Sequence, residues 1–254
     1  MIVVSMPRMR SRTALAASAL VLCFATGCAR PSMSNDTFSS PELSPLSDAV
    51  ARGDAAEIRR QLEHVDADAP GSDGSTLLLA AIAKGQQASV EALLQGGADP
   101  NRPGPRGDTA VHAAAFSGKA ELLRLVLEHG GDANARNPHT GTTPLVQALL
   151  SPRADQYRVL LDAGADPGIA DRNGDTPLHV AARTNNGGAI LALLAKGAPP
   201  LAENSGGASF QSYYFGYNRA LLNDRALAER KAVADWLKAN GVPLEAAVSE
   251  ADQQ

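Results

Sequence analysis

The chain has few cysteines and few aromatic residues. Two of its 254 residues are cysteine, Cys23 and Cys28, and rings make up 4% of the sequence. Because residues 29–254 contain no thiol, the folded body cannot be a disulfide scaffold, hold a cysteine-ligated zinc ion or use a thiol nucleophile. Its core must be built mainly from small and aliphatic side chains.

An excess of basic residues is also absent. The sequence has 23 Lys+Arg against 27 Asp+Glu, a formal net charge of −4. A nucleic-acid surface needs a basic face or interleaved aromatics, so we expect no nucleic-acid partner. With 44% apolar and 20% charged residues, the composition is typical of a soluble globular protein of one or two domains.

The motifs of an active site are missing as well. There is no Gly-x-Ser-x-Gly, no Ser-x-x-Lys and no phosphate-loop glycine pattern. None of the five histidines has a Cys, His or carboxylate at ligand spacing on a shared helix face. We therefore expect no catalytic residue, no metal and no cofactor, and an enzyme, such as a hydrolase, is the rival class.

The N-terminus reads as a targeting segment. Three arginines precede an apolar run over 14–25, which ends at Thr26-Gly27-Cys28. The run is too short to span a bilayer, and its arrangement is that of a secretory signal. We predict a signal peptide over 1–27; translation starting at Met6 or Met9 instead of Met1 would leave it intact.

The small residues before Cys28 resemble a bacterial lipobox. The resemblance implies that the Cys28 sulfur receives a diacylglycerol and that cleavage makes Cys28 the new N-terminus. Cys23 is a poor rival because Leu22 before it is too large. Since Ala29 is not the aspartate that commonly retains such lipoproteins in the inner membrane, a periplasm-facing outer-membrane anchor is favoured. Ordinary signal-peptidase cleavage and an uncleaved anchor remain the alternatives.

A unit of about 33 residues repeats along the rest of the chain. Threonines 76, 109, 143 and 176 are spaced 33, 34 and 33 residues apart, and each has a glycine two residues earlier. Leucine-rich stretches that end in glycine follow each threonine. Weaker units begin at Ser44 and Ser209, and the last carries about ten inserted residues. Self-similarity at this period indicates a repeat architecture.

The repeat resembles the ankyrin repeat, and residues 171–182 carry nearly the whole family motif. The resemblance implies an all-α ankyrin-repeat solenoid of about six helix-turn-helix units, with β-hairpin-like fingers. The units begin near 44, 76, 109, 143, 176 and 209 within a domain over 44–248. A flexible tether over 28–43 precedes it, and a polar tail over 249–254 follows it.

Each motif residue has a local role in such a unit. Threonine caps a helix, and a following proline suits the first helical turn. The imidazoles of His112 and His179 can bond back to that turn or reach the next repeat. Repeat four lacks its helix glycine and has Pro152 near that position, so we expect an irregular helix turn there.

The family resemblance also implies a binding surface. In ankyrin-like arrays, variable residues on the fingers and at the exposed ends of the first helices line a concave face that usually contacts the partner. At these positions stand Asp73, Lys84, Arg106, Asp108, Phe116, His139, Arg172, Asn173, Asp175 and Arg183. Mixed charges with one aromatic suit a protein partner better than a polyanion, although single positions can be no more than solvated turn residues.

Half of the rings lie between Phe210 and Tyr217. Tyr213, Tyr214 and Tyr217 form a partner-binding patch in one interpretation, since tyrosine combines a large contact area with little rotamer entropy. In the other interpretation the rings fill the degenerate last repeat.

The sequence as a whole predicts a non-enzymatic interaction protein anchored in the bacterial envelope. By family analogy it is an adaptor or an inhibitor, such as an immunity protein against a toxin or lipase. The alternative is an accessory protein that supports a periplasmic enzyme in stress defence. The sequence does not identify the partner.

Overall fold

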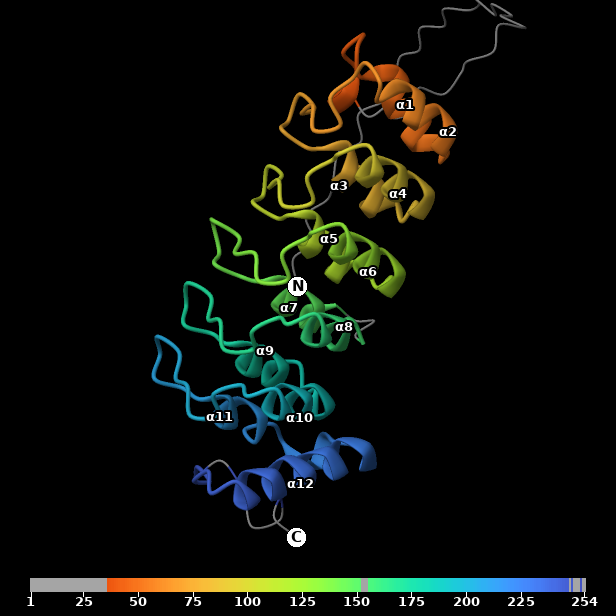
Figure 1. The fold of residues 1–254 in the computed structure, drawn as a ribbon. Coiled ribbons are helices and arrows are strands. Elements are labelled where there is room, and N and C mark those ends of the chain that lie inside the picture. Colours follow the sequence, from red (N-terminus) through yellow and green to blue (C-terminus); the bar gives the residue numbers. More distant parts are fainter. Residues whose placement is uncertain (1–35, 152–154, 247, 249–251, 253–254) are drawn as a thin grey trace, which may run out of the picture. The chain divides into compact units, whose positions relative to one another are not determined.

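A computed structural model describes residues 36–151, 155–246, 248 and 252, which belong to one unit, Asn35–Gln254. The signal peptide over 1–27 and the lipidation of Cys28 lie outside the described residues. Figure 1 shows the unit as a stack of helix pairs with loops projecting on one side.

Six helix pairs form the stack, as the fold-class prediction requires. The pairs are α1 (Ser44–Arg52) with α2 (Ala55–Gln61), α3 (Leu77–Lys84) with α4 (Gln87–Gln95), α5 (Ala110–Phe116) with α6 (Ala120–Glu128), α7 (Pro144–Leu150) with α8 (Gln156–Asp162), α9 (Pro177–Arg183) with α10 (Gly187–Ala195), and α11 (Phe210–Tyr214) with α12 (Asp224–Ala239). Two 3-10 helices, η1 (Asp36–Phe38) and η2 (Arg219–Leu221), complete the set. Each first helix packs on the next first helix, from α1 to α11.

The predicted caps begin the first helices. The Thr76 hydroxyl accepts from the Leu79 N–H at 3.2 Å, and Thr109 and Thr176 form capping boxes with the histidines three residues later. Repeat four ends its first helix differently, because Ser151 has an extended backbone (φ −73°, ψ 130°) where Gly85 ends α3 in the left-handed conformation. The irregular turn is thus present at Ser151, and Pro152 lies outside the described residues.

Alanine and leucine fill most of the core, which explains how a chain with few aromatic residues forms one. Ala81, Ala114 and Ala181 on first helices are buried against second-helix leucines such as Leu93 and Leu193. Small side chains let the two helices of a pair approach closely. Because each unit packs only against its neighbours, the core stays thin and needs few aromatic side chains.

Both predicted ends of the domain require correction. Phe38 and Leu43 are buried, and the Ser72 N–H donates to the Thr37 carbonyl at 2.7 Å. The tether over 28–43 is therefore wrong for its last residues, which pack on the first repeat because Phe38 finds apolar surface there. The predicted polar tail over 249–254 lies outside the domain, but Asp252 within it is 1% exposed and therefore belongs to the packed unit.

The last repeat is the irregular one, as its inserted residues predict. Between α11 and α12 the chain forms η2 and a loop, and α12 has 16 residues where α10 has nine. Asp252 lies 3.0 Å from Arg230 Nε and 2.7 Å from Arg219 Nη1. Arg230 also donates to the carbonyls of Phe215 and Tyr217, at 2.7 and 3.0 Å. One buried cation thus connects the insertion, α12 and the end of the domain.

Candidate protein-binding surface

The projecting loops are five fingers, each closed by a backbone hydrogen bond across its base. Four of these bonds run from Gly71 N to Ser75 O, Gly104 N to Asp108 O, Asp171 N to Asp175 O and Asn204 N to Ala208 O, at 2.8–3.0 Å. An isolated bridge, Glu203 to Ser209, is the one β-type pairing among the described residues. The predicted fingers are therefore present as hairpin-like turns.

Neighbouring fingers are bonded to each other. The Arg172 N–H donates to the Thr140 carbonyl at 3.0 Å, and the Ser205 N–H donates to the Asn173 carbonyl at 2.9 Å. Such bonds hold the fingers in a row, so their outward side chains keep fixed spacings before any partner arrives.

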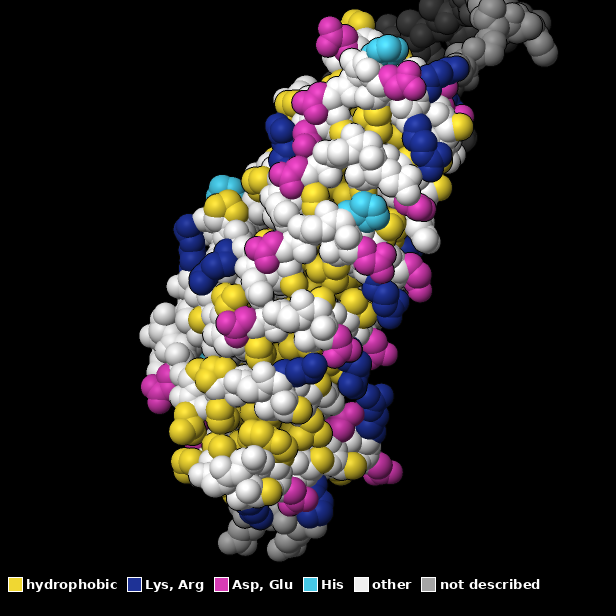
Figure 2. Space-filling view, viewed as in Figure 1, with side chains coloured by type: hydrophobic (Ala, Val, Ile, Leu, Met, Phe, Trp, Pro, Cys, Tyr) yellow, Lys and Arg dark blue, Asp and Glu magenta, His cyan; other side chains and the backbone are white. Residues whose placement is uncertain are grey.

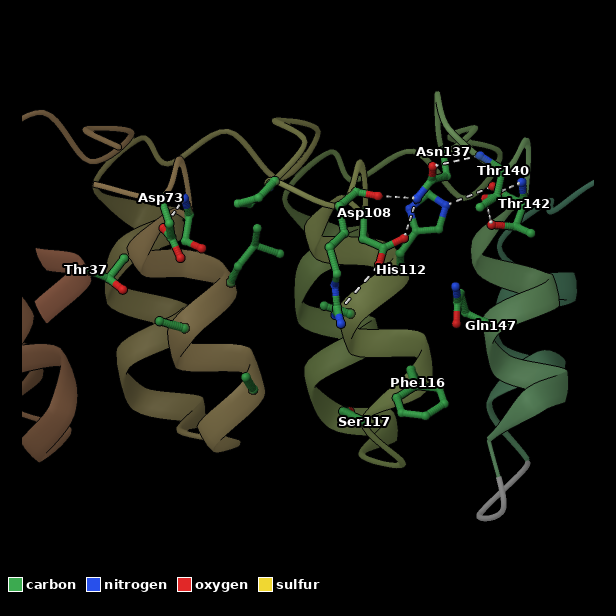
Figure 3. A pocket seen from close by; sticks show the side chains of 18 of the residues that line it. Thr37, Asp73, Asp108, His112, Phe116, Ser117, Asn137, Thr140, Thr142 and Gln147 are labelled. Carbon is green, nitrogen blue, oxygen red and sulfur yellow. Dashed lines mark hydrogen bonds and ion pairs between the residues drawn. The ribbon is translucent and has the colours of Figure 1, made fainter. Parts of the chain in front are cut away.

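A groove of about 970 Å³ lies between the fingers and the helices α3, α5 and α7. Figure 3 shows finger residues on one side of it and Phe116 and Ser117 at the end of α5. Of the ten residues predicted on the fingers and first helices, Asp73, Arg106, Asp108 and Phe116 line the groove. Phe116 is 54% exposed and lines the groove, so a large apolar ring faces solvent there.

Asp108 is held in place by its neighbours. The Asn137 side-chain amide donates to Asp108 Oδ1 and to the Arg106 carbonyl, both at 2.8 Å. The Arg106 guanidinium lies 4.0 Å from the Asp108 carboxylate, and the Arg106 side chain is 90% exposed. Asp108 therefore has a positioning role within the finger, whereas Arg106 is free to contact a partner.

His112 joins two repeats below the groove. Its Nδ1 accepts from the Thr109 N–H at 3.3 Å, which leaves the ring proton on Nε2, 3.1 Å from the Thr142 carbonyl. Burial lowers the pKa of His112, although the bond to Thr142 opposes the shift. The neutral imidazole thus serves both of the roles expected from the motif.

A second cluster lies at the C-terminal part of the same face. Asp175 is buried, and its carboxylate accepts from Arg183 at 2.7 Å and from Asn204 at 2.9 Å. Burial alone raises the pKa of Asp175, but these two hydrogen bonds and the Arg183 charge outweigh it, so the pKa lies below its usual value. Arg183 also lies over the Tyr213 ring, 5.6 Å from its centroid.

The five rings between Phe210 and Tyr217 are not all in the same environment, so neither interpretation holds for all of them. Tyr214 is fully buried, as are Phe210 and Phe215, so the prediction that Tyr214 contacts a partner is wrong. Its ring fills the space between α11 and α10, where the hydroxyl lies against Gly187. Tyr213 is half-buried and accepts from Asn204 at 3.0 Å, whereas Tyr217 is exposed and donates to the Arg183 carbonyl.

The other predicted contact residues lie outside the groove. Lys84 is exposed at the end of α3, and His139, Arg172 and Asn173 are exposed at finger tips. Groove residues that the sequence reasoning missed include Ala80, Ala113 and Gln147. Each stands four residues after a capping threonine, so helical spacing could have found them one turn before Ala83 and Phe116.

Two further searches cover only the part of the chain that the structure describes. No group of three or more His, Cys, Asp or Glu side chains there could hold a metal ion. Among those same residues, no helix has the length and hydropathy that a bilayer crossing requires.

The stacked helix pairs and the projecting fingers define a repeat protein, and comparisons with known proteins agree. Models of ankyrin repeats match residues 102–171, 73–104 and 173–205. Protein PhlB of Serratia liquefaciens is 43% identical over 184 residues, which cover 69% of this chain and 80% of that protein. Protein fem-1 homolog A of Bos taurus is 44% identical over 54 residues, 21% of this chain and 8% of that protein. The chain belongs to the ankyrin-repeat family.

Solved structures give the same fold. The ankyrin-repeat domain of Bcl-3, a member of the IkappaB family, matches with a TM-score of 0.66 and 25% identity, over 76% of this chain and 85% of that one. The ankyrin-repeat protein EF0377 matches with a TM-score of 0.61 and 24% identity, over 66% and 89%. Ankyrin-repeat domains are protein–protein interaction modules and are generally not enzymes, and this chain has that architecture.

Proposed function

We propose that the concave face binds a partner protein in the envelope of a bacterium, and that the chain acts there as an adaptor or an inhibitor. The observation that carries the proposal is the groove of about 970 Å³ with the half-exposed Phe116 ring at its wall. Aromatic side chains at the centre of an interface supply much of its binding energy.

The groove is suited to a protein segment. Its floor is apolar, from Leu79, Ala80 and Ala113, and its finger side is polar. Arg106 and Asp73 place opposite charges on that side, which favours a partner with mixed charges over a polyanion. Because the Asn137 side chain already joins two of the groove's fingers, through the Arg106 carbonyl and Asp108, binding orders fewer side chains there and loses less entropy.

The envelope location is supported by the sequence around Cys28. The apolar run and the lipobox-like residues are features of a bacterial lipoprotein. A relative in the bacterium Serratia liquefaciens agrees with a bacterial setting.

Photo-crosslinking in cells of the native host tests the contact face. We expect p-benzoylphenylalanine at position 116 to give one discrete adduct with another protein. The same residue at position 128, exposed on the second helix α6, is the matched control and should give none. Equal labelling from both positions, or none from position 116, would reject the concave face as the binding site.

Membrane fractionation tests the anchor separately. Cys28→Ser should move the protein from the membrane fraction to the soluble fraction, because it removes the sulfur that would carry the lipid. Cys23→Ser should leave fractionation unchanged. An unchanged distribution of Cys28→Ser would exclude lipidation at this residue, while leaving the crosslinking result intact.

A further inference from the structure

The first two fingers are not bonded to each other in the part of the chain that the structure describes. We number the fingers in chain order as finger 1 (71–75), finger 2 (104–108), finger 3 (137–142), finger 4 (171–175) and finger 5 (204–208). Between the other neighbours a bond is present, donated by the Asn137 side chain to finger 2, by the Arg172 N–H to finger 3 and by the Ser205 N–H to finger 4. The row is therefore open between finger 1 and finger 2.

Three residues explain why this junction has no bonds. Pro105 is the second residue of finger 2 and has no N–H, whereas the second residues of fingers 4 and 5 donate to the previous finger. Gly104 has no side chain where fingers 3 and 5 have an asparagine that donates across the junction. Leu79 stands where His112 reaches the next finger at 3.1 Å. All three residues line the groove, so the groove opens where the bonds are missing.

Finger 2 also has two backbone donors without an acceptor. In finger 4 the Asp171 side chain accepts from the N–H groups of the third and fifth residues, at 2.8 and 3.0 Å, and the Asn204 side chain does the same in finger 5, at 3.0 and 3.2 Å. Gly104 offers no such oxygen to the N–H groups of Arg106 and Asp108, which have no hydrogen-bond partner among the described residues. Finger 2 thus lacks an oxygen that fingers 4 and 5 supply for themselves.

We propose that the partner protein supplies this oxygen with an Asp or Glu side chain that inserts between fingers 1 and 2; the inference rests on the proposed binding at the concave face. Two nearby backbone N–H groups suit an anionic oxygen, and hydrogen bonds to a carboxylate are stronger than those to a neutral acceptor. The Arg106 side chain, 90% exposed, adds a positive charge to the same finger. The Asp108 carboxylate is already engaged by the Asn137 amide and lies near Arg106, which weakens its repulsion of an incoming acid.

The preference for an acid arises at this junction and not from the charge of the whole chain. The net charge is −4, and Figure 2 shows acidic and basic side chains interspersed over the face in view. An acidic segment is therefore not attracted to the surface at large, and it gains binding energy only where unpaired donors and Arg106 lie together.

Other groups at the junction indicate that the acid belongs to a protein segment. The Asp73 carbonyl on finger 1 has no donor among the described residues, although the equivalent Asn173 carbonyl accepts from the next finger, so a backbone N–H of the segment can bond to it. The exposed Phe116 ring offers apolar contact to a side chain beside the acid. Figure 3 shows Asp73, Asp108 and Phe116 around the same groove. A small free anion would use the two N–H groups and leave the carbonyl and the ring without contacts.

Peptide selection on the purified full chain, immobilised in a mild detergent, tests the proposal. We expect peptides enriched from a random library displayed on phage to share an Asp or Glu next to an apolar residue. In a synthetic copy of an enriched peptide, replacing the acid by alanine should weaken binding about tenfold or more, because a charge-assisted hydrogen bond is lost.

Gly104→Asn separates the two N–H groups from the rest of the groove. The new side chain accepts from them as Asn204 does within finger 5, so the acidic peptide and its alanine version should bind this variant equally well. Only the flexible end of Leu79, 2.6 Å from the position of the new Cβ, has to move. Gly206→Asn places the same residue at the exposed tip of finger 5 and should keep the difference between the two peptides. Arg106→Gln, at a solvent-exposed side chain, should reduce that difference, and melting temperatures check that each variant folds.

Two results would overturn the proposal. The first is a selection that enriches no acidic peptide, and if inorganic phosphate also raises the melting temperature of the wild type but not of Gly104→Asn, the two N–H groups bind a free anion instead. The second is a difference between the two peptides that persists undiminished in Gly104→Asn or in Arg106→Gln. Photo-crosslinking from position 116 in the native host tests the concave face by itself, so an adduct there without the acid dependence would reject this inference and leave the proposed function standing.

Discussion

The middle repeats and the last repeat are joined to their neighbours by different kinds of bond. Between residues 99 and 166, the neutral side chains of Asn101 and Asn134 each accept from the backbone of the next turn, at 2.8 and 2.7 Å, and we call this row of bonds the Asx ladder. The last repeat uses a buried Arg230–Asp252 pair and the rings of Phe210 and Tyr214. Repeated neutral bonds distribute stability over many junctions, whereas a unique buried charge pair concentrates it in one.

The largest expected effect comes from removing one partner of that charge pair. Asp252→Ala leaves the Arg230 guanidinium buried without its carboxylate, and breaking a buried pair typically costs about 3–5 kcal/mol. Hydrogen exchange should show faster opening of α12, with α4 unchanged because units pack only on neighbours. Arg225→Ala, in an exposed pair with Glu229, is the control and should alter α12 exchange little. Equal exchange in Asp252→Ala and the wild type would contradict this distinction.

Removing one step of the Asx ladder should cost less. Asn101 accepts from the Asp132 N–H and donates to the Gly130 carbonyl at 2.9 Å. Asn101→Ala removes both bonds at an exposed site where water partly replaces them, so we expect a loss of about 1 kcal/mol. Leu201→Ala stands at the equivalent position without the ladder and should lose less under the same urea titration. A larger loss of stability in Leu201→Ala than in Asn101→Ala would contradict the stabilising role of the Asn101 hydrogen bonds.

The His112 contact makes the middle repeats sensitive to acid. Because burial lowers the pKa of His112 in the folded protein, the unfolded chain, with its usual value near 6.5, binds the proton first. Stability should therefore fall as pH decreases through about 6.5 and below. Urea titrations at several pH values should show a flatter profile for His112→Leu, which has no ring to protonate. Parallel profiles for the two proteins would refute the role of this imidazole.

The smallest expected effect is a gain. Asp68 occupies the ladder position that Asn101 and Asn134 occupy in the next turns, and burial raises its pKa. Asp68→Asn keeps the acceptor for the Asp99 N–H and adds a donor toward the Gly97 carbonyl, as Asn101 has toward Gly130. We expect about 0.5–1 kcal/mol of stabilisation at neutral pH. The gain should shrink in acid, where the wild-type carboxylate is protonated in the fold; a pH-independent difference would argue against this cause.

The period of the sequence predicted the stack, the caps and the fingers because each depends on local residues. Where the motif residues stand at their fixed spacing, as Thr109 with His112 and Thr176 with His179, they form the same capping contacts in each unit. Phe38, Tyr214 and Asp252 were misassigned for the opposite reason. Their burial depends on contacts with segments outside the repeat pattern, such as Asp252 with Arg230, and no local spacing reveals those contacts.

The Asx ladder also bears on how the chain can change its length. The turn at Asp132 receives a donor and an acceptor from Asn101 and presents the same pair to the next turn through Asn134. Duplicating a 33-residue unit at this point would therefore restore every bond at both new junctions. After Gly168 the same bond cannot form, because Gly168 has no acceptor side chain and Pro199 has no N–H. Repeats can therefore be added in the middle of the array without losing this bond, but not near its C-terminal end.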